Sequence, residues 1–323
     1  MSSRRFRAPA GFRCAAQAVG VLASGILAAG ILAGGIVAGG IVAGGDARAA
    51  EDGVEVVSDV AAIESFHSAQ LAIHGIAGNP AVFIFDFPTL EQQGRMFSRI
   101  LALIERQGGE RERVLTDAEL DRLIKASGKG AATYAYGNDF RVGELVKFFN
   151  MASDDRIALN EDEGRLRDFL LASGAMARKF EFYNAVPPDR VVISIPQSAR
   201  AAAGRVAVTP QLRTAILHHE LSHGEFYSND AYADYCRRFW AGVMSEGQRA
   251  AFRRFLTRKG YDPGNTELII NETQAYLIHT PSQAIFSPAK VGLTAREVET
   301  LVNGFWAGKP PGRLFPRDDR RSH

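Results

Sequence analysis

The chain has 323 residues, of which 46% are hydrophobic, and a formal net charge of +2 at pH 7. Residues 1–49 hold five basic residues and one acidic residue, so the rest of the chain carries 33 basic and 35 acidic residues. Such a balanced charge argues against nucleic acid as a partner. Cys236 is the only cysteine after residue 49, which excludes an intramolecular disulfide there. A chain of this length can bury an adequate core without one.

The N-terminal residues predict an export segment. Four arginines lie within residues 4–13, whereas residues 14–45 contain no charge and repeat a five-residue Gly-Ile-Leu/Val-Ala theme. Ala47-Arg48-Ala49 has the small-x-small pattern of a signal-peptidase site. We therefore expect residues 1–49 to be a signal peptide and the protein to be periplasmic or secreted. The alternative is an uncleaved membrane anchor, because about 20 apolar residues can span a bilayer.

Residues 50–188 are expected to form a mostly helical N-terminal subdomain. A β run at residues 81–87 ends before Pro88. Capping boxes at Thr116–Glu119 and Asn160–Glu163 each precede apolar residues at helical spacing. Short strands among many helices predict an α+β fold with a small antiparallel or mixed sheet.

A second unit is expected over residues 189–306. It opens with a strong β run at residues 191–195 and a shorter one at 206–208. Thr209-Pro210 then begins a helix, with threonine as the cap and proline at the first helical position. Residues 307–323 are rich in proline and charge, and we expect them to be a disordered tail.

The most informative motif of the chain lies in that helix, where residues 219–223 read His-Glu-Leu-Ser-His. Residues four apart share a helix face, so His219 and His223 can bind one metal ion while Glu220 meets a bound water. The helix is apolar on nearly all sides, and buried histidines would be costly there without a ligand role. The motif predicts one Zn²⁺ per chain, with Glu220 as the general base.

Glu272 is the candidate for the third metal ligand. It lies in Asn-Glu-Thr-Gln-Ala, within an apolar helical stretch at residues 267–279. An H-E-x-x-H motif followed by a helix with N-E-x-x-A resembles the gluzincin, or thermolysin-like, zinc metallopeptidases, over the last third of the chain. The resemblance implies that His219, His223 and Glu272 are the ligands, that Glu220 is the base, and that residues 189–306 form a zincin-like catalytic domain.

The resemblance leaves open which group orients the histidines. Thermolysin-like enzymes commonly have an aspartate four residues after the ligand glutamate, and that position is Tyr276 here. Asp230 and Asp234, just beyond the motif helix, are the candidates instead. The metzincin arrangement does not fit, because the position six residues after the second histidine is Asn229. An unconventional ligand, Asp230 or Glu225, remains an alternative.

Hydrolysis of an amide also needs a hydrogen-bond donor for the developing oxyanion. Tyr276 and His279 lie four and seven positions after the candidate ligand, on the same helical face, so either could donate. Tyr227, four residues after His223, is a third candidate. Each also has a structural interpretation, as a buried tyrosine or as a histidine at a helix C-terminus. His218 points away from the motif face and is interpreted as a packing residue or a support of the ligands.

These patterns predict an exported zinc metallopeptidase that hydrolyses amide bonds in a peptide or protein, with cell-wall peptides among the candidate substrates. An extended substrate could add as a strand beside residues 191–195 or 206–208, if one of these runs is an edge strand. Two other classes compete with this interpretation. One is a non-catalytic zincin-fold envelope protein that binds metal or a protein partner, and the other is a helical binding protein with an accidental motif.

Overall fold

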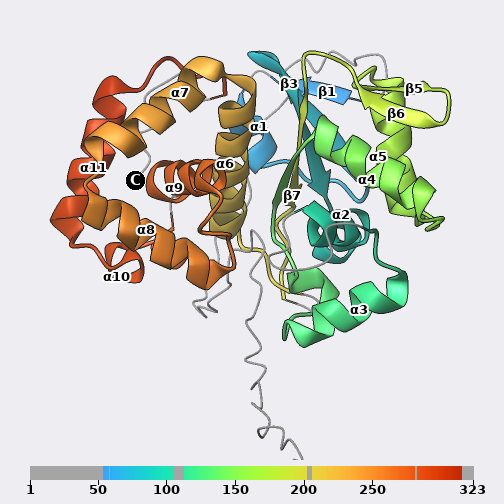
Figure 1. The fold of residues 1–323 in the computed structure, drawn as a ribbon, viewed down its shortest axis with the longest axis horizontal. Coiled ribbons are helices and arrows are strands. Elements are labelled where there is room, and N and C mark those ends of the chain that lie inside the picture. The colour runs from blue at the N-terminus through green and yellow to red at the C-terminus, as the bar shows by residue number, and fades with distance from the viewer. Residues whose placement is uncertain (1–53, 58, 105–112, 202–205, 281, 315–323) are drawn as a thin grey trace, which may run out of the picture.

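The computed structural model describes residues 54–57, 59–104, 113–201, 206–280 and 282–314 (Figure 1). It is an α+β fold, as the sequence predicts, with the sheet standing between two groups of helices. The predicted signal peptide or anchor at residues 1–49 lies outside the described residues. Among the helices that are described, none has the length and hydropathy that a membrane crossing requires.

One five-stranded mixed sheet forms the centre of the fold. Parallel pairs join β1 to β2 and β3 to β7, whereas β2 with β3 and β7 with β4 are antiparallel. The order across the sheet is β1 (Val54–Val57), β2 (Ala72–Ile76), β3 (Asn79–Phe87), β7 (Val191–Pro196) and β4 (Asn138–Arg141).

The central strands bury both faces, and their side chains alternate between two hydrophobic cores. Val82 and Ile84 of β3 face the core formed with the C-terminal helices, whereas Phe83 and Phe85 face the core formed with the N-terminal helices. A strand that is buried on both faces is a continuous apolar run, which is why residues 81–87 were recognisable as β structure from the sequence.

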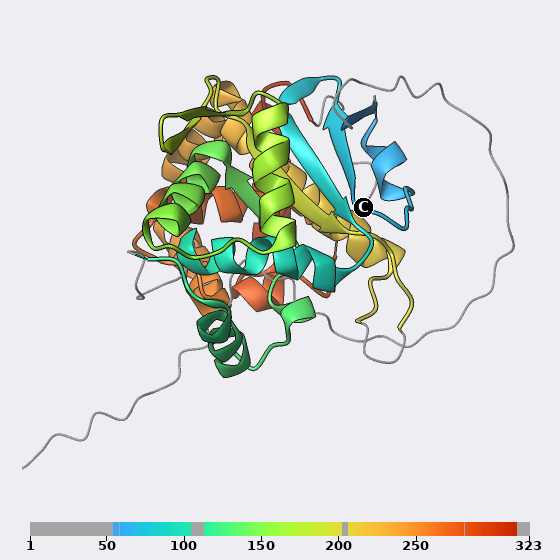
Figure 2. The same cartoon turned by 90° about the vertical axis from the view of Figure 1, so that its right-hand side faces the viewer.

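The helices before residue 188 cover one face of the sheet, and Figure 2 shows α2, α4 and α5 in front of it. The capping boxes predicted at Thr116 and Asn160 are present and begin α3 and α5. The short α1 (Val60–Glu64) is an exception and packs against α6. The elements on this side are α2 (Leu90–Ile104), α3 (Asp117–Ala126), η1 (Ala131–Thr133), α4 (Val142–Asp154), α5 (Glu161–Ala172) and the hairpin of β5 (Met176–Lys179) with β6 (Phe182–Ala185).

The opposite face of the sheet carries α6, which packs against β7 on one side and α9 on the other. The remaining C-terminal helices surround α9 (Figure 1). The side chain of Thr209 accepts a hydrogen bond from the Leu212 amide and Pro210 is the first helical residue, as predicted. These helices are α6 (Pro210–Ser228), α7 (Asp230–Arg238), η2 (Phe239–Val243), α8 (Glu246–Lys259), α9 (Thr266–His279), α10 (Pro288–Val291) and α11 (Ala295–Gly308).

The structure corrects the sequence-based description of the sheet. The predicted boundary at residue 188 does not divide it, because β7 pairs with β3 and β4, and four of its five strands precede that boundary. β7 is therefore an internal strand and cannot be the substrate-binding edge. Residues 206–208 contribute only an isolated bridge between Ala199 and Val208. The edge on this side of the sheet is β4.

The start of the predicted disordered tail is also ordered. Residues 309–314 run back to α6, where the backbone amides of Arg313 and Leu314 donate hydrogen bonds to the buried carboxylate of Glu225. The Leu314 side chain is buried in the core with the C-terminal helices. The prediction of disorder was wrong for these residues because composition does not show that the buried carboxylate of Glu225 accepts hydrogen bonds from their amides. Residues 315–323 lie outside the described part of the chain.

Candidate metal centre

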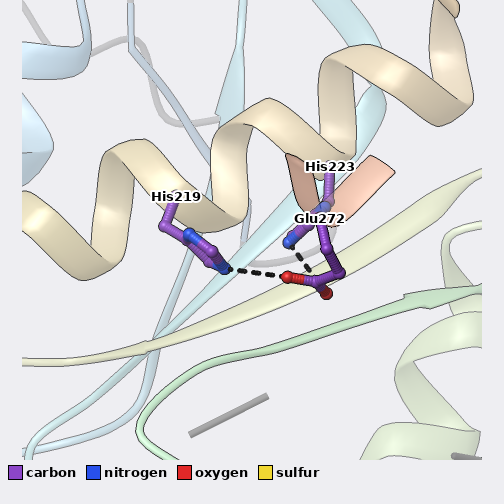
Figure 3. Close-up of side chains that lie close together, drawn as sticks. All are labelled: His219, His223 and Glu272. Atoms are coloured by element: carbon purple, nitrogen blue, oxygen red, sulfur yellow. Dashed lines mark ion pairs between the residues drawn. The ribbon is translucent and has the colours of Figure 1, made fainter. Parts of the chain in front are cut away.

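Two helices bring three metal-binding side chains to one point (Figure 3). His219 and His223 project from the same face of α6, and Glu272 faces them from α9. The Nε2 atom of His219 is 3.6 Å from Oε2 of Glu272, and that of His223 is 3.7 Å from Oε1. The helical spacing of four and the packing of α6 on α9 therefore assemble the predicted ligands.

The geometry and burial of these groups fit a metal ion. All three residues are at most 1% exposed, and their ligand atoms lie within 4.8 Å of one another. Metal bonds of about 2.0–2.2 Å in a tetrahedral arrangement place ligand atoms about 3.3 Å apart, close to the observed separations. His223 Nε2 is also buried without a hydrogen-bond partner in the described part of the chain. Such an atom is costly unless an ion binds it.

His219 is held in the form that can bind a metal. Its Nδ1 lies 2.9 Å from Oγ1 of Thr280, and that hydroxyl donates its own hydrogen to the carbonyl of Ala275. The hydroxyl oxygen must therefore accept from Nδ1–H, which leaves the lone pair on Nε2. Burial lowers the pKa of His219 well below its usual value, and the neighbouring His223 adds to the effect. A neutral imidazole is the ligand form.

His223 is oriented in the same way by an amide. Its Nδ1 is 3.0 Å from Oδ1 of Asn271, the residue before the ligand glutamate. Gln274 donates to the same oxygen and to the hydroxyl of Ser222, so the acceptor role of Asn271 is fixed by a network. Asn271 and Thr280 thus orient the two histidines, as outer groups commonly do in metal sites.

The acidic residues considered for these roles lie elsewhere. Asp230 is exposed at the start of α7, and Asp234 forms an ion pair with Arg237. The carboxylate of Glu225 binds Asn229 and the backbone of the C-terminal segment. Asp230 and Asp234 therefore do not orient the histidines, and neither Asp230 nor Glu225 belongs to the ligand group. The prediction of an acidic orienting group was wrong because that role belongs to two uncharged side chains, those of Asn271 on α9 and Thr280 next to it.

Glu220 lies beside the ligand group and is fully buried. Gly137, immediately before β4, packs directly against it. A Cβ at that position would lie only 2.2 Å from Oε1 of Glu220, so any larger residue would displace the carboxylate. The absence of a side chain at Gly137 therefore leaves room for this carboxylate beside the sheet edge.

Asp139 completes a second group of possible metal ligands, together with Glu220 and His223. Its Oδ1 is 4.0 Å from Nε2 of His223. Burial raises the pKa of Asp139 well above its usual range, and the negative charge of Glu144 adds to the rise. Sequence reasoning missed Asp139, because only the pairing of β4 with β7 brings this strand next to α6. No local pattern marks that contact.

The predicted oxyanion donors have different surroundings. The ring of Tyr276 lies edge-on to His219, with centroids 4.6 Å apart, and burial and the charge of Glu272 raise the pKa of its phenol well above its usual value. His279 instead places Nε2 3.0 Å from the hydroxyl of Tyr232, which donates to Gln274. Tyr276 is thus next to the ligands, whereas His279 is directed toward α7.

Two further predictions concern neighbours of the motif. Tyr227 is partly buried, and burial followed by the charge of Asp139 raises the pKa of its phenol well above its usual value. It therefore lies on the side of the site that faces β4. His218 places Nε2 2.8 Å from a carboxylate oxygen of Glu64 on α1, away from the ligand group. His218 therefore points away from the motif face, as the sequence predicts.

Lys259, the last residue of α8, is a charged neighbour of the site that the sequence did not reveal. Its Nζ lies 5.0 Å from the centroid of the Tyr276 ring and 5.1 Å from that of Phe255. Burial lowers the pKa of Lys259 to about 8, and the positive charges of Lys290 and Lys129 act in the same direction. Glu272 attracts it and opposes the shift. The sequence did not indicate that Lys259 lies near the site, because basic residues are common at the C-terminal end of a helix.

A separate cavity of about 470 Å³ lies at the carboxyl ends of β3 and β7. It is lined by residues that include His67, Gln197 and Arg200, and none of the ligand group contributes to it. The comparisons with known proteins add no candidate for either place: no family model, no curated protein and no solved structure matches this chain. The functional conclusion therefore depends on the chemistry of the ligand group.

Proposed function

We propose that this protein is an exported zinc metallopeptidase of the gluzincin type. The observation that carries the proposal is the buried convergence of His219, His223 and Glu272, with Glu220 beside them. Two neutral imidazoles and one carboxylate are a common ligand set of catalytic zinc, which keeps a fourth position for water or substrate. Two imidazoles and a carboxylate can also hold Fe²⁺, but their place on an H-E-x-x-H helix, with Glu220 beside the ligands, favours Zn²⁺, one per chain.

In this proposal zinc, when bound, supplies a water of lowered pKa and polarises the substrate carbonyl. The carboxylate of Glu220 takes a proton from the attacking water and later returns it to the leaving amine. Gly137 leaves the space that this carboxylate occupies, and Thr280 and Asn271 orient the two imidazoles. Tyr276, whose phenol keeps its proton at neutral pH, is the candidate donor to the developing oxyanion.

The proposed substrate is a peptide or protein, with cell-wall peptides included, and the proposed location is periplasmic or secreted. β4 is the available sheet edge beside Glu220, so an extended chain that adds to the sheet would do so there. No role for nucleic acid is proposed. Association with a membrane would follow only if the N-terminal segment stays uncleaved.

One observation favours the second candidate function, a non-catalytic zincin-fold envelope protein that binds metal or a partner. Glu220 and the three proposed ligands are each at most 1% exposed. A structural metal site is typically closed, whereas a peptidase must admit a substrate. Movement of the segment around Gly137 would be needed to uncover Glu220. The two candidates make opposite predictions for the role of Glu220.

The test compares the parent chain with Glu220→Gln, which keeps the size of the side chain and removes its basicity. We expect turnover of a mixed peptide library to fall by a factor on the order of 10² to 10⁴, while zinc per chain stays unchanged. Glu299→Gln, at an exposed position of α11, is the matched control and should have no effect on either quantity. Loss of zinc in Glu220→Gln would contradict the proposed role. Absence of cleavage by a zinc-loaded parent would favour the non-catalytic candidate.

A further inference from the structure

Three lysines from different parts of the chain gather on one side of the ligand group. Lys259 ends α8, Lys290 lies in α10, and Lys129 precedes η1. The charges of Lys290 and Lys129 both act on Lys259, and the charge of Lys259 in turn acts on His219. The three ammonium groups therefore share one electrostatic neighbourhood that reaches the proposed ligands.

Among the residues that the structure describes, none is a counter-ion to Lys259 of the kind that a half-buried lysine usually has. Within the described residues it forms neither an ion pair nor a hydrogen bond, and its ammonium lies over the rings of Phe255 and Tyr276. In the part of the chain that the structure describes, the ammonium groups of Lys129 and Lys290 donate to backbone carbonyls, those of Tyr134 and Ala284, and Lys129 also lies over the Tyr134 ring. None of these contacts supplies a negative charge.

The carboxylate that attracts Lys259 is Glu272. That carboxylate is the proposed metal ligand, so its charge is already matched when a divalent ion is bound. The lysines then have an uncompensated positive charge next to a buried reaction site, which is electrostatically costly in a region of low dielectric constant. An anion that arrives with the substrate would remove this cost.

We infer that Lys259, assisted by Lys129 and Lys290, binds a carboxylate of the substrate close to the bond that is cleaved. The inference rests on the proposed function, and it deepens that function by naming the substrate class. The carboxylate can be the C-terminus of a peptide or an acidic side chain next to the scissile amide. Both sources present the same chemistry to an ammonium group.

The opposite side of the site carries acidic side chains, whose charge is complementary to that of the lysines. Asp139 and Glu220 lie against His223 on the side of β4, whereas the lysines lie beyond Tyr276 on the side of α8. A peptide that crosses the site would place its carboxyl-terminal end toward the lysines and its amino-terminal end toward the acidic pair, or the reverse. The lysines favour the orientation in which opposite charges meet.

The experiment measures peptide binding to the zinc-loaded Glu220→Gln protein, in which turnover is blocked. The probes are N-acetyl-trialanine as the free acid, the same peptide as the amide, and N-acetyl-Ala-Glu-Ala amide, each titrated at low ionic strength. We expect the free acid or the glutamate peptide to bind at least about tenfold more tightly than the trialanine amide, as a charged hydrogen bond implies. Which of the two binds more tightly identifies the source of the carboxylate.

Substitutions then assign the preference to the lysines. Lys259→Met should abolish it, and Lys259→Arg should retain most of it because the charge remains. Lys147→Met, at an exposed position of α4, is the matched control and should leave it intact. Equal binding of all three peptides, binding of none, or a preference that survives in Lys259→Met would overturn the inference. Zinc per chain, measured on the same samples, separates the two proposals: a parent that holds no zinc overturns the proposed function, whereas a zinc-loaded protein without the preference overturns only the carboxylate site.

Discussion

Helix α6 carries two buried polar clusters, and they are built on opposite principles. The first is centred on Arg213, whose guanidinium donates to both oxygens of Asp86 at 2.8 Å and to the backbone carbonyls of Pro196, Glu64 and Ile63. Nε2 of His74 lies 3.3 Å from the same carboxylate. The guanidinium of Arg213 and the carboxylate of Asp86 are directed at each other, so their charges are matched and each makes its hydrogen bonds within the cluster.

The second cluster begins only six residues later, and its three ligand groups converge on one another instead of forming hydrogen-bonded pairs. His219, His223 and Glu272 are as deeply buried as Arg213, yet Nε2 of His223 has no hydrogen-bond partner among the described residues. Burial of polar groups therefore does not by itself mark a functional site. A functional site is marked by buried ligand atoms that lack partners within the protein and are stabilised only when an ion or a ligand binds.

The largest expected effect separates the two clusters through stability. Arg213→Met leaves Asp86 buried without its partner, and we expect the free energy of unfolding to fall by about 3–5 kcal/mol in urea titrations. Zinc per folded chain should be unchanged, since Arg213 touches none of the proposed ligands. A loss of zinc from protein that is still folded would break the distinction between a structural and a functional cluster.

Arg237→Met is the matched control for that substitution. Arg237 also forms ion pairs with two carboxylates, Glu267 and Asp234, but it is exposed on α7. Solvent screens such pairs, so we expect a change of less than about 1 kcal/mol. If Arg237→Met lowered the free energy of unfolding as much as Arg213→Met does, burial would not explain the large contribution of the Arg213 cluster to stability.

The next effect concerns the groups that orient the ligands. Asn271→Leu removes the acceptor for Nδ1 of His223 while keeping a side chain of similar size, and we expect metal affinity to fall by a factor of about 10–100. Asn303→Leu, at an exposed position of α11, should change nothing. Competition with a chelating dye measures both. An unchanged affinity in Asn271→Leu would mean that the network around α9 serves packing alone.

The smallest expected effect is on the stability contribution of Lys259, whose buried ammonium should destabilise the folded chain. Burial lowers the pKa of Lys259 to about 8, so between that pH and its usual 10.5 the unfolded chain binds more protons than the folded chain. Stability should therefore rise with pH across this window, whereas below it the full cost of the buried ammonium is present. Lys259→Met should raise the free energy of unfolding at pH 7 by about 1 kcal/mol and flatten the rise above pH 8. A stability loss would indicate that Lys259 serves packing.

The sequence was sufficient to predict those parts of the site that depend on the spacing of residues along one helix. The motif helix, its cap at Thr209 and the helix that presents Glu272 are present where they were predicted, and the two helices bring the three candidate ligands together. These features depend on the periodicity of one helix at a time, so one sequence is enough to recognise them.

The rest of the site depends on contacts between distant segments. Gly137 and Asp139 reach Glu220 and His223 only because β4 is paired with β7, and Lys259 approaches Tyr276 through the packing of α8 on α9. The groups that orient the histidines are an amide and a hydroxyl, which the sequence presents at many positions. Strand pairing and helix packing of this kind have no local signature, so the sequence could not indicate them.

The most direct test of the central claim is zinc per chain, measured by elemental mass spectrometry after dialysis against a weak chelator. We predict about one zinc in the parent and a large loss in Glu272→Ala, because two histidines alone hold the ion weakly. Glu267→Ala, at an exposed position of the same helix, is the matched control and should retain zinc like the parent. A folded parent without zinc, or equal retention in Glu272→Ala and the parent, would contradict the account of the ligand group.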